Sequence, residues 1–304
     1  MARIGFRRHV FLAAALAAIL LTGARPLEGR TVVLDAGHGT GSGGSYGGYV
    51  EAVRMLFLAE LLQEELEKRG AAVFVTRPGH ADVHLPRRAA MSNRWSLQAV
   101  WNERVDRLSG LLPEWERQAL QSELFELRRL MDVLDRIVAD SALYAPLYMN
   151  YPWDASRGTA IHPTWRRVFD FQAEPAIRYN WLAISLHSNA ADDRGVSGAD
   201  VFYSANYNPL GARYFDGYAH QDITRLFGEM LLARIAGLGI ASRNVEPAEF
   251  LFVRENNLPS VLVENGFHTN AGDRMLLSSD VFMRELARAY ADTIEDYFAA
   301  IRRK

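Results

Sequence analysis

The chain has 304 residues, of which 49% are hydrophobic and 23% are charged, as in an ordinary globular protein. Its formal net charge of -2 gives no indication of binding to nucleic acid. The absence of cysteine excludes disulfides, thiolate zinc sites, a cysteine nucleophile and a lipid-anchored cysteine. The length predicts one large domain, or one domain that carries an insertion.

Residues 1–24 predict a secretory signal peptide. A basic start that includes Arg7 and Arg8 precedes an unbroken apolar run, Val10–Leu21, and small residues follow at Thr22–Ala24. The run is shorter than the roughly 20 residues of a membrane span. We therefore expect an exported protein of the periplasm or cell envelope with no stable membrane span; the alternative is an uncleaved membrane anchor.

After this segment, short apolar runs that predict strands alternate with stretches of helical periodicity. The predicted strands are Thr31–Ala36, Ala71–Thr76, Trp181–Leu186, Ala199–Tyr203, Phe250–Val253 and Ser260–Val263. The predicted helices are Ala52–Arg69, Leu85–Arg94, Ile223–Leu238 and Val281–Ile301. The alternation predicts an α/β fold, with an open, mostly parallel sheet and helices on both faces.

A helical insertion at about residues 95–177 interrupts this alternation. Apolar residues recur there every three or four positions, at Leu120, Leu124, Leu127, Met131, Leu134 and Val138. This spacing predicts one apolar face of a long amphipathic helix, and Pro113 suits its start. The stretch Tyr144–Gln172 is rich in Tyr, Trp, Pro and Asn, which predicts irregular structure.

Candidate catalytic side chains fall at the carboxyl ends of three predicted strands, where open α/β sheets bind their ligands. His38 follows the first strand, His187 ends the Trp181–Leu186 strand, and Glu264 ends the Ser260–Val263 strand. Glu51, at the start of the first long helix, is a fourth candidate near the same rim. Glu264 directly follows the apolar run SVLV, and a buried carboxyl group there favours a functional role.

Two imidazoles and a carboxylate are a common catalytic zinc set that leaves one position open. His38, Glu51 and His187 could be such ligands, with Glu264 as the general base. The glycines after the first strand also match GxGxxG, but residues 46–50 separate them from the helix, unlike a dinucleotide loop. We therefore favour the metal interpretation, in which the glycines make room close to an ion and substrate.

Five segments together resemble one known family. VVLDAGHG, the stretch from GGYVEAVR to VFVTR, LPRRAAMSN, AISLHSNA and LPSVLVENGFHTN occur in the same order as in the zinc-dependent N-acetylmuramoyl-L-alanine amidases of the third amidase family. These are bacterial cell-wall enzymes. The resemblance covers roughly residues 31–93 and 181–297.

The resemblance implies an amidase catalytic domain over residues 31–304, interrupted by the helical insertion. It implies Zn²⁺ held by His38, Glu51 and His187, with Glu264 as the catalytic base, and it suggests substrate binding by Asn189. The implied substrate is the amide that joins N-acetylmuramic acid to L-alanine in peptidoglycan, cleaved in cell-wall remodelling or daughter-cell separation. Alternatives are a zinc peptidase acting on the stem peptides and a non-catalytic wall-binding protein.

Two features depart from the family. His268 stands where the family usually has an aliphatic residue, and a surface or core histidine is favoured over a histidine in the site. The helical insertion is not required by the family's catalytic core. It is either a solvated excursion packed on the core by its leucine face, or a lid, inhibitory element or dock for an activating or inhibitory partner.

Overall fold

The computed structural model describes residues 25–151, 161–204, 206, 214–218 and 220–302. The predicted signal peptide, residues 1–24, lies outside these ranges. Within them, no helix combines the length and the apolarity that a membrane crossing requires.

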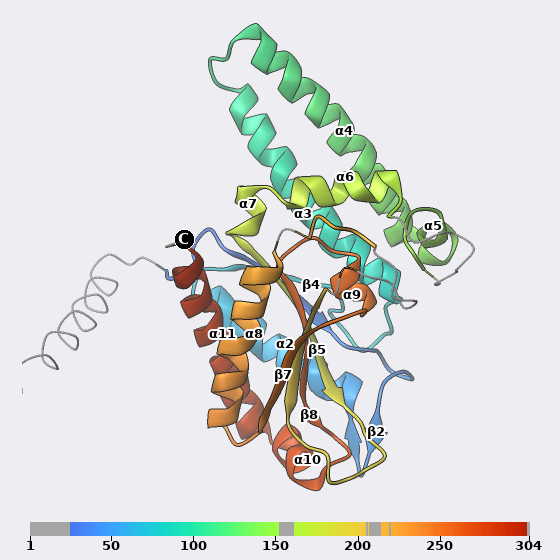
Figure 1. Ribbon diagram of the computed structural model, residues 1–304, viewed down its shortest axis with the longest axis vertical. Coiled ribbons are helices and arrows are strands. Elements are labelled where there is room, and N and C mark those ends of the chain that lie inside the picture. Colours follow the sequence, from blue (N-terminus) through green and yellow to red (C-terminus); the bar gives the residue numbers. More distant parts are fainter. Residues whose placement is uncertain (1–24, 152–160, 205, 207–213, 219, 303–304) are drawn as a thin grey trace, which may run out of the picture.

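The described residues form a central six-stranded sheet (Figure 1). In spatial order its strands are β4 (Ala72–Val75), β1 (Thr31–Ala36), β5 (Trp181–Asn189), β8 (Ser260–Phe267), β6 (Ala199–Ser204) and β7 (Ser242–Ala248). The first four strands in this order run parallel, whereas β6 lies antiparallel to β8 and parallel to β7. The prediction of an open, mostly parallel sheet is therefore confirmed.

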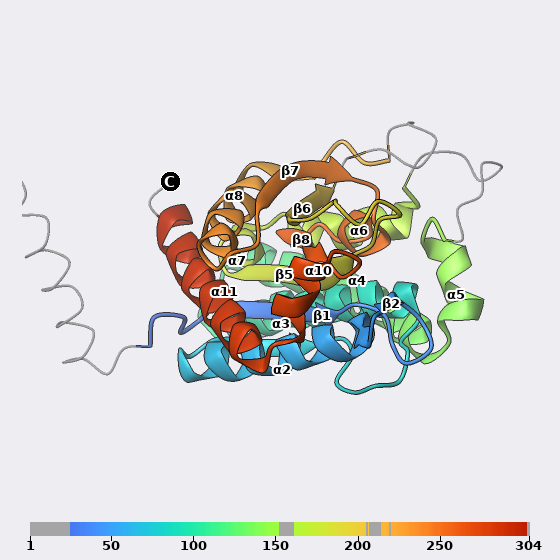
Figure 2. The same cartoon turned by 90° about the horizontal axis from the view of Figure 1, so that it is seen from below.

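Helices cover both faces of the sheet, because consecutive strand residues point to opposite faces and the central strands carry buried apolar side chains on both. In β1, Val32 and Leu34 pack into one core cluster, whereas Val33 packs into the other. The first cluster is closed by helices α2 (Glu51–Lys68), α8 (Gln221–Gly237), α10 (Ala271–Ser278) and α11 (Asp280–Ile301). Figure 2 shows α2, α8 and α11 along this face of the sheet.

The second face carries the helical insertion and one short helix from the C-terminal half. Its helices are α3 (Leu85–Leu108), α4 (Glu114–Ala139), α5 (Ser141–Tyr148), α6 (Pro163–Gln172), α7 (Pro175–Arg178) and α9 (Leu251–Arg254). Helices α3 and α4 lie side by side, and Figure 1 shows their far ends extending beyond the sheet. The predicted helix Leu85–Arg94 is thus only the first part of α3, which continues without a break into the insertion.

The predicted apolar face of α4 is present. Leu120, Leu127, Met131 and Leu134 are buried, and Leu124 is half-buried. The residues at Leu130 and Ile137 are also buried, so the apolar stripe is wider than the sequence spacing alone indicates.

Two predictions of secondary structure are wrong. The described part of the stretch Tyr144–Gln172 is mostly helical, since it contains the C-terminal half of α5 and all of α6, where Trp165, Val168 and Phe169 follow helical spacing. Residues Phe250–Val253 do not form a strand, because most of them lie in the short helix α9. The edge strand is instead β7, which is polar and largely exposed and therefore lacks an apolar signal.

Candidate metal centre

Neighbouring parallel strands bring the candidate residues together at one edge of the sheet. His187 in β5 is the register partner of Glu264 in β8, so both side chains lie on the same side. Strands β5 and β8 continue for two or three residues beyond these positions, whereas the sequence places both residues at strand ends. His38 follows β1, the other neighbour of β5, by two residues.

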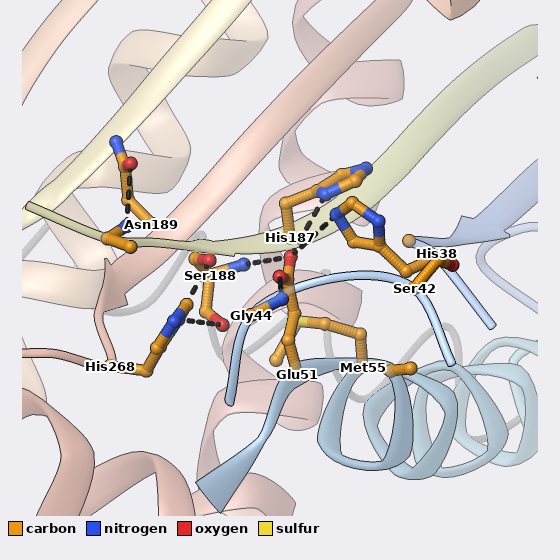
Figure 3. Close-up of polar contacts among 12 residues, drawn as sticks. His38, Ser42, Gly44, Glu51, Met55, His187, Ser188, Asn189 and His268 are labelled. Atoms are coloured by element: carbon orange, nitrogen blue, oxygen red, sulfur yellow. Dashed lines mark hydrogen bonds and ion pairs between the residues drawn. The ribbon is translucent and has the colours of Figure 1, made fainter. Parts of the chain in front are cut away.

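Glu51 is the centre of the cluster (Figure 3). Its Oε1 atom lies 3.1 Å from Nδ1 of His187 and 3.4 Å from Nε2 of His38. The backbone N–H of Ser188 donates to Oε1 at 3.1 Å, and that of Gly44 donates to Oε2 at 2.9 Å. As the first residue of α2, Glu51 also lies at the helix end that favours a negative charge. The structure thus fixes the carboxylate between two imidazoles.

The electrostatics of the three residues suit a cation site. Burial raises the pKa of Glu51, but the hydrogen bond and charge of His187, with His38 and the Gly44 N–H, lower it to about 2. Burial lowers the pKa of His38, which favours the neutral ring that binds metals. For His187, burial lowers the pKa, yet its hydrogen bond to Glu51 and the nearby carboxylates raise it overall. Glu51 is therefore ionised at neutral pH.

His38 has a left-handed backbone, with φ of 60°, which is uncommon for a residue with a side chain. Two buried arginines support this conformation. Arg88 donates to the carbonyl oxygens of Ala36 and His38, and Arg77 donates to those of Ala36 and Gly37, at 2.9 and 3.1 Å. These bonds fix the loop that positions the His38 ring.

The sequence analysis missed the positioning role of both arginines. Arg77 lies two residues after β4 and Arg88 lies in the first turn of α3, and each is only 1% exposed. Arg88 also lies 3.3 Å from the buried carboxylate of Asp35, which accepts a hydrogen bond from Ser185 at 2.6 Å. The one signal in the sequence for such a role is a charged residue next to an apolar element, but most charged residues in that position are exposed.

Glycines pack directly against the histidine rings. A Cβ atom on Gly37 would lie 2.5 Å from the His187 ring, and one on Gly43 would lie 2.6 Å from the His38 ring. At Gly44 it would lie 2.3 Å from the ring of His268. Any side chain at these positions would displace a ring, so the glycine-rich loop makes room for the three histidine rings.

His268 belongs to the core beneath the cluster. It is 2% exposed, its Nδ1 lies 3.1 Å from the hydroxyl of Ser188, and it stacks on Tyr49 with ring centroids 5.3 Å apart. Tyr49 in turn donates to the Ser188 hydroxyl at 3.0 Å. Because the backbone of Ser188 binds Glu51, this network supports the carboxylate from behind.

Asn189 is not brought to the cluster. Figure 3 shows its side chain pointing away from His187, and its Oδ1 accepts the N–H of Ala190 at 2.8 Å. A cavity lies beside the cluster, and Asn189 is not among its lining residues. A substrate contact by Asn189 remains a prediction from the resemblance.

A cavity of about 420 Å³ opens beside the cluster, and His38, His187 and Glu264 line it. The Oε2 atom of Glu264 is buried and has no hydrogen-bond partner among the described residues. Burial raises the pKa of Glu264 to about 7, although the charge of His187 opposes the shift. A carboxyl group in this state can exchange a proton with a ligand near neutral pH.

Comparison with known proteins agrees with this geometry. The N-acetylmuramoyl-L-alanine amidase family, Amidase_3, matches residues 32–100 and 178–296, which is more than half of the chain. The chain belongs to this family. Residues 101–177, the larger part of the helical insertion, lie outside the ranges that match the amidase family.

Individual amidases resemble part of the chain in sequence, or most of it in structure. The N-acetylmuramoyl-L-alanine amidase LytC of Bacillus subtilis (strain 168) is 30% identical over 117 residues, covering 38% of this chain and 21% of LytC. The chain spans less than half the length of curated relatives such as this one.

Among solved structures, the amidase AmiC2 of Nostoc punctiforme has a TM-score of 0.51 at 21% identity, covering 89% of this chain and 98% of that one. The CwlD amidase of Clostridioides difficile, solved in complex with the GerS lipoprotein, has a TM-score of 0.50 at 18% identity, covering 89% and 99%. At these identities, the likeness shows that the amidase fold is shared.

Proposed function

We propose that this chain is an exported, zinc-dependent amidase that cleaves the amide between the lactyl group of N-acetylmuramic acid and L-alanine in peptidoglycan. The observation that carries the proposal is the convergence of His38 and His187 on one oxygen of Glu51, beside a cavity that Glu264 also lines. Membership of the amidase family supports the choice of substrate.

The donor set fits zinc. Ligand atoms held tetrahedrally at about 2.0–2.1 Å from one zinc ion lie about 3.3 Å from each other. The separations of 3.1 and 3.4 Å between Glu51 and the two imidazole nitrogens match that spacing. The three ligand atoms all lie within 4.8 Å of one another. We assign His38, Glu51 and His187 as the residues that would hold the ion.

When bound, zinc would polarise the amide carbonyl and acidify a water molecule. Glu264 would accept the proton that the attacking water loses as its oxygen bonds to the carbonyl carbon. The same carboxyl group would then deliver this proton to the alanine nitrogen as the carbon–nitrogen bond breaks. A pKa near 7 suits both transfers, because the group neither holds nor releases the proton too strongly.

The biological role follows from the substrate. An exported enzyme of this specificity would act in the periplasm or cell envelope, in wall remodelling or daughter-cell separation. The CwlD amidase binds a lipoprotein partner. By analogy, the helical insertion is a candidate surface for an activating or inhibitory partner of this chain.

Product analysis tests the proposal. The zinc-loaded protein, its Glu264→Gln variant and a control Glu246→Gln, altered at an exposed position of β7, are incubated with purified peptidoglycan. Mass spectrometry should find free stem peptides beginning with L-alanine for the parent and the control only. Fragments cut within the stem would indicate a peptidase instead, and no product from a folded, zinc-loaded parent would contradict the enzyme assignment.

A further inference from the structure

The cavity beside Glu264 has two walls of different chemistry. The sheet edge and the loop after β1 supply one wall, which carries His38, His187 and Glu264. The other wall comes from the segment before α3, the residue Tyr151 after α5, and the start of α9. Its side chains are mainly apolar or aromatic, namely Val83, Leu85, Tyr151, Phe250, Leu251 and Phe252.

The helical insertion presents Tyr151 to this cavity. The Tyr151 hydroxyl lies 3.1 Å from Nε2 of His84, and the two rings meet edge to face with centroids 5.2 Å apart. The other ring nitrogen of His84 lies 2.8 Å from the hydroxyl of Ser141, the first residue of α5. His84 therefore holds both ends of the α5 segment and fixes the position of the tyrosine ring.

The second wall is anchored to the metal centre as well. Arg88 donates to the carbonyl oxygen of Val83 at 2.6 Å and to that of His38. The segment that carries Val83 and His84 is thus tied to the loop that carries a candidate zinc ligand. Hydrogen bonds of Arg88 therefore join the two walls of the cleft.

The apolar wall matches one half of the proposed substrate. Its charged lining residues among those described, Asp82 and Arg88, pair with each other at 3.2 Å. Stem peptides carry free carboxylates and amino groups, which are costly to place against apolar surface. The sugar is uncharged, and its ring faces and N-acetyl methyl group are apolar. Aromatic side chains provide large apolar surfaces for such groups.

This wall is also accessible. Leu85 and Phe250 keep 43% and 39% of their surface exposed, and Tyr151 is half-buried. Exposed aromatic and aliphatic side chains at the mouth of a cavity are typical of ligand contacts.

We propose that Tyr151 packs against the sugar ring of N-acetylmuramic acid, so that the helical insertion contributes an aromatic side chain to the glycan subsite of the cleft. The inference rests on the proposed amidase function and extends it. Ser141 and Tyr151 lie outside the ranges that match the amidase family, so the insertion adds Tyr151 to a wall whose other side chains lie within those ranges.

Two small substrates test the subsite. One is N-acetylmuramoyl-dipeptide, and the other is the lactoyl-dipeptide, which keeps the scissile amide but lacks the sugar. Tyr151→Ala should lower kcat/KM for the N-acetylmuramoyl-dipeptide about tenfold, chiefly by raising KM. It should leave kcat/KM for the lactoyl-dipeptide unchanged. Tyr151→Phe keeps the ring and should stay within about twofold of the parent. Leu147→Ala, altered at an exposed position of α5 outside the cavity, is the matched control.

Equal losses on both substrates would overturn the proposal, because Tyr151 would then act through the general structure of the site. No loss on the sugar-containing substrate, or a larger loss on the sugar-free one, would overturn it as well. Phe250→Ala, on the same wall, should repeat the selective loss and provides a second variant if Tyr151→Ala fails to fold.

Binding separates this inference from the proposed reaction. Calorimetry with the zinc-loaded Glu264→Gln protein measures affinity for the N-acetylmuramoyl-dipeptide without turnover. Adding Tyr151→Ala should weaken binding about tenfold while the zinc content stays constant. If the parent hydrolyses neither substrate but this loss is seen, the proposed function fails and the subsite stands. If Glu264→Gln does not bind the dipeptide, the subsite fails.

Discussion

Nδ1 of His187 lies 3.1 Å from Oε1 of Glu51, although 136 positions separate the two residues in the chain. Strand β5 lies at the centre of the sheet and Glu51 starts the helix that packs on its neighbour β1, so both are fixed by the core. Without a metal ion, this contact is also an electrostatic stabiliser of the fold, with consequences for its pH dependence.

Glu51 should support the metal-free fold above its ordinary pKa. Its pKa is 4.5 as a reference value and about 2 in the folded protein. A lowered pKa stabilises the fold above pH 4.5, and the stabilisation is lost as the pH falls towards 2. This loss of folding free energy at acid pH is on the order of 3 kcal/mol. Glu51→Gln should remove this part of the pH dependence, because glutamine does not titrate. Urea unfolding of chelator-treated protein between pH 2 and 6 measures the effect, and parallel curves for parent and variant would contradict it.

Zinc binding should depend on both histidines. His38→Ala or His187→Ala removes one of three donors, so zinc should be lost during dialysis that leaves the parent loaded. His80→Ala, altered at an exposed histidine outside the cluster, should retain zinc. Elemental analysis of the dialysed proteins gives the stoichiometry directly. Parental zinc content in either ligand variant, with folding confirmed by circular dichroism, would exclude that residue from the set.

Arg88 should affect both stability and zinc affinity. Arg88→Met leaves the buried Asp35 carboxylate without its cationic partner, which costs about 3–5 kcal/mol of the free energy of unfolding. It also releases the His38 carbonyl, so zinc affinity should fall roughly 10- to 100-fold. Arg87→Met, at the exposed neighbouring position, should change neither quantity appreciably. Denaturant unfolding and competition with a chelating dye provide the two measurements; unchanged zinc affinity in Arg88→Met would show that the loop does not need this support.

The elements that build the site were predictable because their residues repeat a physical pattern. Strands β1, β5 and β8 are apolar on both faces, and parallel strands bring His38, His187 and Glu264 to one edge. The hydrogen bonds of Arg88 to the His38 loop were not predictable, since nothing in the sequence distinguishes the buried Arg88 from the exposed Arg87. That difference arises only when the His38 loop offers its carbonyl groups.

Local sequence patterns also failed to predict the structure of the helical insertion. Prolines and aromatic residues in Tyr144–Gln172 indicate irregular structure, yet Pro163 sits at the first position of α6, where proline is favoured. The role of Tyr151 depends on a contact with His84, far away in sequence, which no local pattern encodes.

The helices of the insertion should be part of the folding unit. Trp165 of α6 is fully buried and shares a core cluster with Val33 and Ala183 of the sheet, whereas Trp115 of α4 is 71% exposed. Trp165→Ala should therefore cost about 3–5 kcal/mol of the free energy of unfolding. Trp115→Ala should stay within about 0.5 kcal/mol of the parent.

Urea unfolding of the two variants, monitored by circular dichroism, compares these tryptophans under one condition. By the same reasoning, deletion of residues 96–175 should unfold the protein instead of activating it, because one face of the sheet would lose its cover. Equal stability of Trp165→Ala and Trp115→Ala, or a folded and more active deletion variant, would show that the insertion is a separable cover over the site.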